Sequence, residues 1–420
     1  NTVSRIDYED GGDWPGRADG KGSSLEILDP SSDPSDPNNW RSSSEYGGTP
    51  GGDGLGPDNR IVINEVLTHT DPPLTDSIEL LNTTDQALDI TGWYLSDTAE
   101  NFKKYQFPDN TILAAGAYLF IDETDFNPDP TNPSSNGFAL SSSKGDSVWL
   151  VEADAEGNVL RFVDHVEFPA ARNAEPFGRW PNSTGKLYPL FAHTPGAPNA
   201  TPRVGPVLIT EIHYSPRSDN PEHQYIEIAN PSTDYISMAN WKLRGGVDYN
   251  FPGWVVLAPN SLLLLVNFST DDPDKFQDFL EEFPDIPANA TILGPLTDGD
   301  LKPDFHNVRL LRPDELLSPP GAEPFYPMLI EEEFMYSSQA PWPTTALTNH
   351  LSLNRLNYTG WGFEATHWQP LLPTPGQHGN LLGDDTDLDG MSDVWELQHF
   401  GSKAHLPVQD YDRDALPNLL

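Results

Sequence analysis

The sequence predicts an all-β fold built from tandem antiparallel β-sandwiches. Its 420 residues include 42 prolines and 33 glycines, a composition typical of many short strands joined by turns. Apolar and polar residues alternate at 61–64 and at 78–80, the pattern of strands with one face in a core. One strand pattern occurs twice along a chain too long for one ordinary core, so we expect two or three domains.

The repeated pattern occupies residues 61–94 (IVINEVLTHTDPPLTDSIELLNTTDQALDITGWY) and 207–243 (VLITEIHYSPRSDNPEHQYIEIANPSTDYISMANWKL). The copies align at Glu65 and Glu211, at Ile78-Glu79 and Ile226-Glu227, at Asn82 and Asn230, and at Trp93 and Trp241. Turn-forming clusters at 71–73 and 230–232 separate the strands, which favours an antiparallel sandwich. Both copies then pass through a Phe-Pro step into apolar strands at 118–121 and 262–266.

The two copies also share an ending, in which a Trp-Pro step precedes a Thr-Pro-Gly sequence at 194–196 and 374–376. A third such ending opens the chain and reaches Thr-Pro-Gly at 49–51. Its segment SSLEILDP corresponds to HLSLNRLN at 350–357. We therefore predict an incomplete repeat over 1–56, complete repeats over 57–203 and 204–380, and a separate tail over 381–420.

This arrangement resembles the lamin tail domain family, an immunoglobulin-like β-sandwich that recurs in tandem in large secreted bacterial proteins. The resemblance rests on the INE and ITE strands, the two Ile-Glu pairs, the segment LDITGWYLSD at 88–97 and the Thr-Pro-Gly endings. It implies immunoglobulin-like sandwiches and an extracellular, cell-surface location. The second copy departs from the first by lacking the glycine before Trp241 and by carrying Asn260 in place of Gly116, which questions the geometry of those two turns.

The tail carries the stretch DDTDLDGMSDVWE, whose spacing fits an EF-hand loop with Gly390 at the sixth position. The ligands expected from the first loop are Asp385, Asp387, Asp389, the carbonyl of Met391, Asp393 and Glu396. A second, shorter loop offers Asp410, Asp412, Asp414, Leu416 and Asn418, with Ala415 in place of the glycine. These all-oxygen sets favour calcium, and 394–400 can form a short helix between the loops.

The pair of loops resembles the calcium-binding segments of dockerins and thrombospondin type 3 repeats. The alternative interpretation is a solvated acidic linker that binds no metal. Because the chain starts inside one repeat and stops inside one loop, we expect it to be a segment of a longer polypeptide.

The composition argues against several classes of partner. A formal charge of -41 repels nucleic acid and anionic lipid, and the chain has no apolar run of the roughly 20 residues that a membrane helix needs. It has no cysteine, so no disulfide stabilises the chain and no thiol takes part in chemistry. We therefore expect no nucleic acid partner and no membrane insertion.

The recurrent glutamates Glu65, Glu79, Glu211 and Glu227 are the best catalytic candidates, since a paired acid and base could be made from them. Their recurrence is better explained by architecture, as strand glutamates that cap backbone amides or face solvent. Familiar nucleophile, phosphate and metal-protease motifs are missing from the sequence. We predict no enzymatic activity in this segment, while a catalytic domain elsewhere in a longer polypeptide stays open.

Eleven tryptophans raise the alternative of carbohydrate binding, because flat aromatic faces stack on sugars. Trp93 and Trp241 recur within the apolar pattern and are expected in the core. Trp254, Trp361 and Trp368 lie in turn-rich segments, where we expect them to be freer to face solvent.

The sequence thus predicts an extracellular structural or adhesive segment with a calcium-stabilised tail. Its expected partners are other copies or other surface proteins, with polysaccharide as an open alternative. A second hypothesis is a non-catalytic accessory region, binding substrate or carbohydrate, of a large secreted enzyme such as a CotH-type kinase-like protein or a hydrolase. A strand missing from the first repeat would also leave an edge that another chain could complete.

Overall fold

A computed structural model of the protein describes residues 6, 8, 14–132, 136–303, 306–356 and 358–377. The chain divides into two compact units, Asn1–Pro202 and Arg203–Leu420. Strands dominate the described part of both units, which has only three α-helices, so the all-β prediction is confirmed. The predicted helical tail over 381–420 lies outside the described residues.

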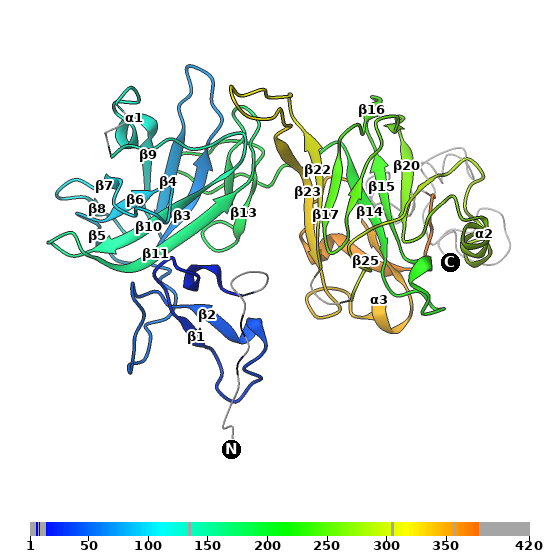
Figure 1. The fold of residues 1–420 in the computed structure, drawn as a ribbon, viewed down its shortest axis with the longest axis horizontal. Helices are drawn as coiled ribbons and strands as arrows, with labels where there is room; N and C mark the ends of the chain where they lie inside the picture. The colour runs from blue at the N-terminus through cyan, green and yellow to red at the C-terminus, as the bar shows by residue number, and fades with distance from the viewer. Residues whose placement is uncertain are drawn as a thin grey trace, which may run out of the picture. The chain divides into compact units, whose positions relative to one another are not determined.

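Two sheets form the sandwich of the first unit (Figure 1). The five-stranded sheet has the order β13-β12-β3-β4-β9, with β3 (Ile61–Leu67), β4 (Ser77–Asn82), β9 (Tyr118–Asp122), β12 (Phe177–Trp180) and β13 (Lys186–Pro189). The four-stranded sheet has the order β11-β10-β6-β7, with β6 (Tyr94–Ser96), β7 (Tyr105–Gln106), β10 (Asp146–Ala153) and β11 (Val159–Phe168). A small pair, β5 (Leu88–Asp89) and β8 (Ile112–Leu113), and helix α1 (Glu123–Phe126) complete it.

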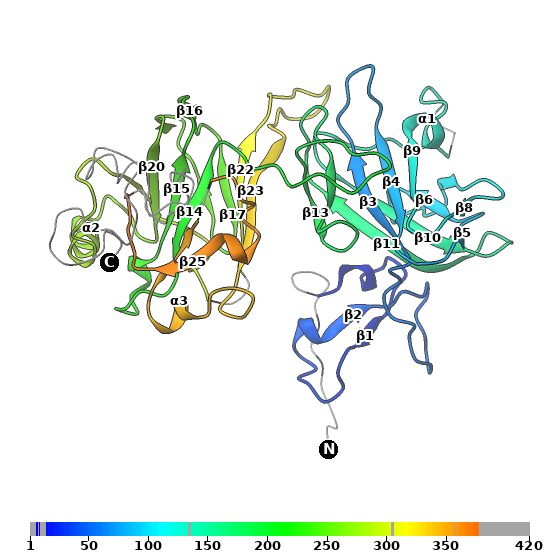
Figure 2. The same ribbon diagram turned by 180° about the vertical axis from the view of Figure 1, so that it is seen from behind.

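The N-terminal segment of the first unit forms a hairpin beside β11, as Figures 1 and 2 show. It contains η1 (Gly16–Ala18), β1 (Leu25–Ile27), η2 (Pro37–Asn39) and β2 (Trp40–Ser42). The chain then runs antiparallel to β11, where Phe162 N donates to Ser44 O at 2.7 Å and Tyr46 N donates to Leu160 O at 2.9 Å. This segment is therefore attached to the edge strand of the four-stranded sheet.

The second unit has a six-stranded and a four-stranded sheet. The first has the order β21-β20-β15-β14-β24-β25, with β14 (Leu208–His213), β15 (Tyr225–Asn230), β20 (Ser261–Val266), β21 (Thr291–Leu293), β24 (Ser352–Arg355) and β25 (Trp368–Leu371). The second has the order β18-β17-β22-β23, with β17 (Lys242–Gly245), β18 (Tyr249–Asn250), β22 (His306–Pro313) and β23 (Met328–Tyr336). The remaining elements are η3 (Pro221–His223), β16 (Ile236–Ser237), β19 (Val256–Leu257), α2 (Pro273–Glu282), α3 (Thr345–Thr348) and η4 (Ala365–His367).

The two sandwiches correspond strand for strand, which confirms the predicted repeat. Strands β13-β12-β3-β4-β9 match β25-β24-β14-β15-β20, and β11-β10-β6-β7 match β23-β22-β17-β18. Trp93 and Trp241 lie just before the matched strands β6 and β17, each within the buried core of its own unit. One pair departs from the antiparallel expectation, because β21 runs parallel to β20.

The two turns in which the copies differ in sequence keep one geometry. Asn240 (φ 63°) and Asn260 (φ 50°) adopt the same left-handed backbone as Gly92 (φ 77°) and Gly116 (φ 65°). Asparagine enters this region more readily than other side chains because its short amide bonds locally. The missing glycines therefore leave the turns intact.

The prediction that the first two strands of each repeat have only one buried face is wrong. Every residue of β3, β4, β14 and β15 is buried. The apolar side chains face the core between the sheets, while the alternating polar ones lie beneath other segments of the chain. In the second unit α2 also covers this outer face, and Phe279 packs in a cluster with Tyr225 and Leu264.

Candidate functional site

The recurrent glutamates lie opposite one another on neighbouring strands in each unit. Glu65 on β3 pairs with Glu79 on β4, and Glu211 on β14 pairs with Glu227 on β15. Each pair follows a β-bulge at the same place in its first strand. All four side chains are 1% or 2% exposed, so they are enclosed by the protein.

Each glutamate pair binds the Thr-Pro-Gly turn that ends its own repeat. Thr194 donates its N–H to Glu65 at 3.1 Å and its hydroxyl at 2.9 Å, and Gly196 N donates to Glu79. In the second unit Thr374 donates its N–H to Glu211 at 3.0 Å and its hydroxyl at 3.1 Å. The Gly376 N–H completes the match, with a 2.9 Å bond to Glu227.

Burial changes the protonation of these carboxyl groups. It raises the pKa of Glu65 from 4.5 to about 7, and repulsion from Glu79 adds to the shift. Burial raises the pKa of Glu79 as well. In the second unit the pKa of Glu227 is raised well above its usual range by burial and then by the charge of Glu211. Two opposed carboxylates out of water favour sharing a proton over carrying two charges.

The second pair has more hydrogen-bond donors than the first. Glu211 accepts from the hydroxyls of Tyr225 and Ser352, each at 2.5 Å, and Glu227 accepts from Thr210 at 2.7 Å. Together with the turn amides, these donors satisfy the buried oxygens. The expectation that the recurrent glutamates cap backbone amides is confirmed, and the alternative that they face solvent is wrong.

An ion pair, partly buried in the first unit and buried in the second, joins the two sheets of each sandwich, and sequence reasoning missed it. Arg179 donates to Ile63 O at 2.9 Å and to Asp164 at 2.8 Å, while Ile63 N donates to Asp164 at 2.6 Å. The N–H and C=O groups of Ile63, beside the bulge, thus bond to the side chains of Asp164 and Arg179 rather than to the backbone of a neighbouring strand.

The second unit repeats the arrangement with an arginine again but with a glutamate in place of the aspartate. Arg355 donates to Ile209 O at 3.2 Å and forms an ion pair with Glu332, which accepts from Ile209 N at 2.5 Å. A single arginine in the last hairpin of each repeat was the available sequence signal. Its acidic partner is Asp164 in one copy and Glu332 in the other, which hides the match.

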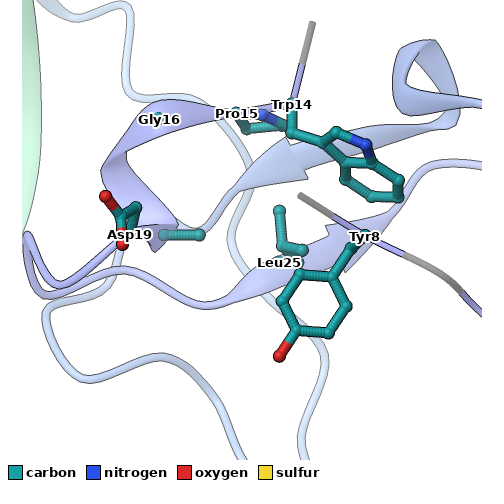
Figure 3. Close-up of a pocket in the computed structure, with 7 residues that line it drawn as sticks. Tyr8, Trp14, Pro15, Gly16, Asp19 and Leu25 are labelled. Carbon is teal, nitrogen blue, oxygen red and sulfur yellow. The ribbon is translucent and has the colours of Figure 1, made fainter. Parts of the chain in front are cut away.

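Grooves that could hold a ligand lie along the N-terminal segment. One of about 350 Å³ is lined by Tyr8, Trp14, Asp19, Leu25 and neighbouring backbone. Figure 3 shows Leu25 beside the rings of Trp14 and Tyr8, with Asp19 at the opposite end. The two rings meet edge to face, 6.3 Å between centroids. We call this the aromatic groove.

A wider groove of about 780 Å³ shares Trp14 and adds Trp40. Charges of both signs line it: the cations Arg17, Lys21 and Arg41, and the carboxylates Asp58, Asp164 and Glu167. Aromatic faces beside hydrogen-bonding and charged groups are suited to polar ligands such as sugars.

The exposure of the tryptophan side chains agrees only in part with the prediction. Trp93 and Trp241 lie in the cores, as expected, and Trp254 is 69% exposed. The expectation that Trp361 and Trp368 face solvent is wrong, since they are 5% and 3% exposed. Trp368 donates its indole N–H to Gly362 O at 2.7 Å and packs against core aromatics, which a turn-rich local sequence did not reveal.

All predicted calcium ligands lie outside the described residues: Asp385, Asp387, Asp389, Met391, Asp393, Glu396, Asp410, Asp412, Asp414, Leu416 and Asn418. Within the described ranges no cluster of three or more His, Cys, Asp or Glu side chains could hold a metal. Within those same ranges, no helix has the length and apolarity to cross a membrane.

Comparison with known proteins gives one family match. The model of the Lamin Tail Domain matches residues 56–169 and 200–302, which together are more than half of the chain. A crystal structure of a DUF4876 family protein from Bacteroides thetaiotaomicron aligns at 10% sequence identity over 76% of this chain and 97% of that one, with a TM-score of 0.27. No curated protein matches. The fold assignment rests on the family match and on the strand order.

Proposed function

Because the chain belongs to the lamin tail domain family, we propose that it is an extracellular structural or adhesive segment that mediates cell-surface or matrix assembly. In this role the tandem sandwiches space neighbouring domains and offer surfaces to other proteins. The charge of -41 keeps such a segment soluble and makes divalent cations its natural counter-ions.

The observation that supports a structural role best is that the recurrent glutamates bind a turn of their own repeat. The acidic pair that recurs in both repeats, Glu65 with Glu79 and Glu211 with Glu227, is buried and bound to the Thr-Pro-Gly turns. A buried carboxylate with its oxygens already bonded has no room for a substrate. The repeated motif therefore holds each sandwich closed.

In this proposal calcium orders the tail at the junction to whatever follows. Asp385, Asp387, Asp389, Asp393 and Glu396 repel one another until a cation neutralises them, so binding and folding of the loop are coupled. An ordered tail would then fix the spacing between neighbouring domains.

Calcium titration of the full chain tests this proposal. We expect calorimetric binding that both Asp387→Ala and Glu396→Ala abolish, and self-association in sedimentation velocity that requires calcium. Asp53→Ala, outside the loops, is the matched control and should change neither result. Failure of the wild-type chain to bind calcium, or unchanged binding in both loop variants, would refute the calcium-dependent role.

The aromatic groove favours a second candidate, a non-catalytic region that holds a polysaccharide for a secreted enzyme. Tyr8 and Trp14 present rings to a groove large enough for a sugar unit, with polar and charged side chains close by. We expect retardation of the chain in gels containing a neutral polysaccharide, lost in Trp14→Ala and kept in Trp254→Ala, whose tryptophan is exposed elsewhere. Equal mobility with and without a panel of polysaccharides would refute it.

A further inference from the structure

The short ribbon formed by β16 and β19 in the second unit carries aromatic side chains on its outer face. Ser237 of β16 lies opposite Val256 of β19, and paired residues of antiparallel strands share a face. Because side chains alternate along a strand, Tyr235 and Trp254, two residues before them, belong to the same face. We call the side chains of Tyr235, Val256 and Trp254 the aromatic strip.

Burial follows this alternation. Met238, Val255 and Leu257 point inward, are 2% exposed or less and belong to the core of the second unit. The three side chains of the aromatic strip are 54% to 75% exposed. Figures 1 and 2 show β16 at the end of this sandwich away from α3. The strip therefore faces outward on the described part of the unit.

The first unit shows that the fold does not require these aromatic side chains. Its strands β5 and β8 pair in the same way, with Asp89 opposite Ile112. The two aromatic places are occupied there by Ala87 and Asn110. Since the first sandwich has the matching strand order without them, the exposed rings of the second are not explained by packing.

The ribbon is uncharged in a strongly acidic chain. Residues 235–241 and 249–260 contain no Asp, Glu, Lys or Arg, although these residues make up 21% of the sequence. The outer face also offers few hydrogen-bonding groups, and the Ser237 hydroxyl oxygen already accepts from Ala239 N at 3.4 Å. A charged ligand, or one with many unpaired hydroxyls, would lose water here without gaining a partner.

The strip is too small to hold a folded protein by itself. One aromatic side chain buries at most about 250 Å², whereas stable protein interfaces bury about 1,200–2,000 Å². Tyr235 and the place opposite Trp254 are four residues apart along the ribbon, which is about 13 Å. A strip of this length can contact a few linked sugar rings.

We propose that the aromatic strip binds the flat face of an insoluble, neutral polysaccharide, a β-1,4-linked glucan. Chains packed in such a solid satisfy their hydroxyls among themselves and expose the C–H faces of their sugar rings, on which Tyr235 and Trp254 can stack. A rigid solid loses little conformational freedom on binding, so a small contact area suffices. The site is in the other unit from the aromatic groove and needs no calcium.

Depletion of the full chain from solution by microcrystalline cellulose, measured in EDTA, tests the proposal. We expect saturable binding whose affinity falls by about tenfold in Trp254→Ala, because the burial of one aromatic face is lost. Adding Tyr235→Ala should abolish it. Since both side chains are exposed, the variants should keep the urea unfolding curve of the wild type.

Matched variants separate stacking from general apolar adhesion. Trp254→Tyr keeps a flat ring and should retain most of the binding, whereas Trp254→Leu keeps apolar bulk without a ring and should not. Phe191→Ala removes a ring that is 80% exposed in the first unit and should leave binding unchanged.

No saturable depletion, equal depletion in the double alanine variant, or equal retention on cross-linked dextran beads, which have no crystalline faces, would overturn the proposal. Retardation by a dissolved polysaccharide depends on Trp14 instead, and assembly depends on calcium. Failure of cellulose binding is therefore distinct from failure of either proposed function.

Discussion

Glu65 accepts the N–H and the hydroxyl of Thr194 although its side chain is almost fully enclosed. Because Glu65 binds Thr194 through a carboxyl group, which can ionise, the contribution of this contact to stability depends on pH. Because the folded pKa is raised, the contribution of Glu65 to stability is full below pH 4.5 and is lost as the pH rises through about 7. The loss is on the order of 3 kcal/mol.

Glu65→Gln should remove this dependence, because the amide keeps an acceptor oxygen and cannot ionise. We expect the variant to gain stability relative to the wild type between pH 5 and pH 8, by on the order of 3 kcal/mol. Hydrogen exchange of the β3 and β4 peptides in the full chain measures it. Glu100→Gln, at an exposed position, is the control. A difference between wild type and Glu65→Gln that is the same at both pH values would contradict the assignment.

The two arginines that join the sheets differ in burial. The Arg355 side chain is fully buried and its partner Glu332 nearly so, whereas Arg179 and Asp164 are each 14% exposed. Removing one member of a buried pair leaves the other charge without compensation, and water relieves this less in the deeper site.

Arg355→Met should therefore destabilise the second unit by about 3–5 kcal/mol. Arg179→Met should cost the first unit less, about 2 kcal/mol. Urea unfolding of the full chain, with peptide-resolved hydrogen exchange to assign each unit, compares them. Replacing Glu332 with leucine in the Arg355→Met background should recover part of the loss. Equal costs in the two units would show that burial does not set the difference.

At the scale of the elements, the two repeats form one strand order from sequences that differ at their turns. Gly92 and Asn240 adopt the same left-handed backbone, so what the element requires is a positive φ rather than a particular residue. The turn then delivers Trp93 or Trp241 to the core at the start of β6 or β17.

Asn240→Gly should therefore be close to neutral, whereas Asn240→Val should destabilise the second unit by about 1–2 kcal/mol, because a β-branched residue is strained at positive φ. The same substitutions at Asn260 should follow the same order. The effect is measured as the shift in the urea concentration at which half of the protein is unfolded, provided that the dependence of the unfolding free energy on urea stays the same. A valine variant as stable as the glycine variant would mean that the turn can adopt another conformation without cost.

Across the whole molecule, acidic residues outnumber basic ones by 64 to 23, and the charge of -41 opposes the compact state. Salt screens this repulsion, since the Debye length falls to about 3 Å at 1 M. We expect the unfolding temperature in EDTA to rise by a few degrees between 20 mM and 500 mM NaCl, equivalent to about 1 kcal/mol. A constant or falling unfolding temperature would show that local ion pairs outweigh the net charge.

Strand periodicity and the recurring motifs determined the all-β class, the tandem repeat and the core positions of Trp93 and Trp241, because alternation and matched spacing are local properties of a chain. Only the tertiary structure decided what the recurrent glutamates bind, since Glu65 and Thr194 are 129 residues apart and Glu211 and Thr374 are 163 apart. The burial of Trp361 and Trp368 likewise depends on strands distant in sequence. A local pattern shows which face of a strand is polar, and only the packing of distant segments decides whether water or another part of the chain covers it.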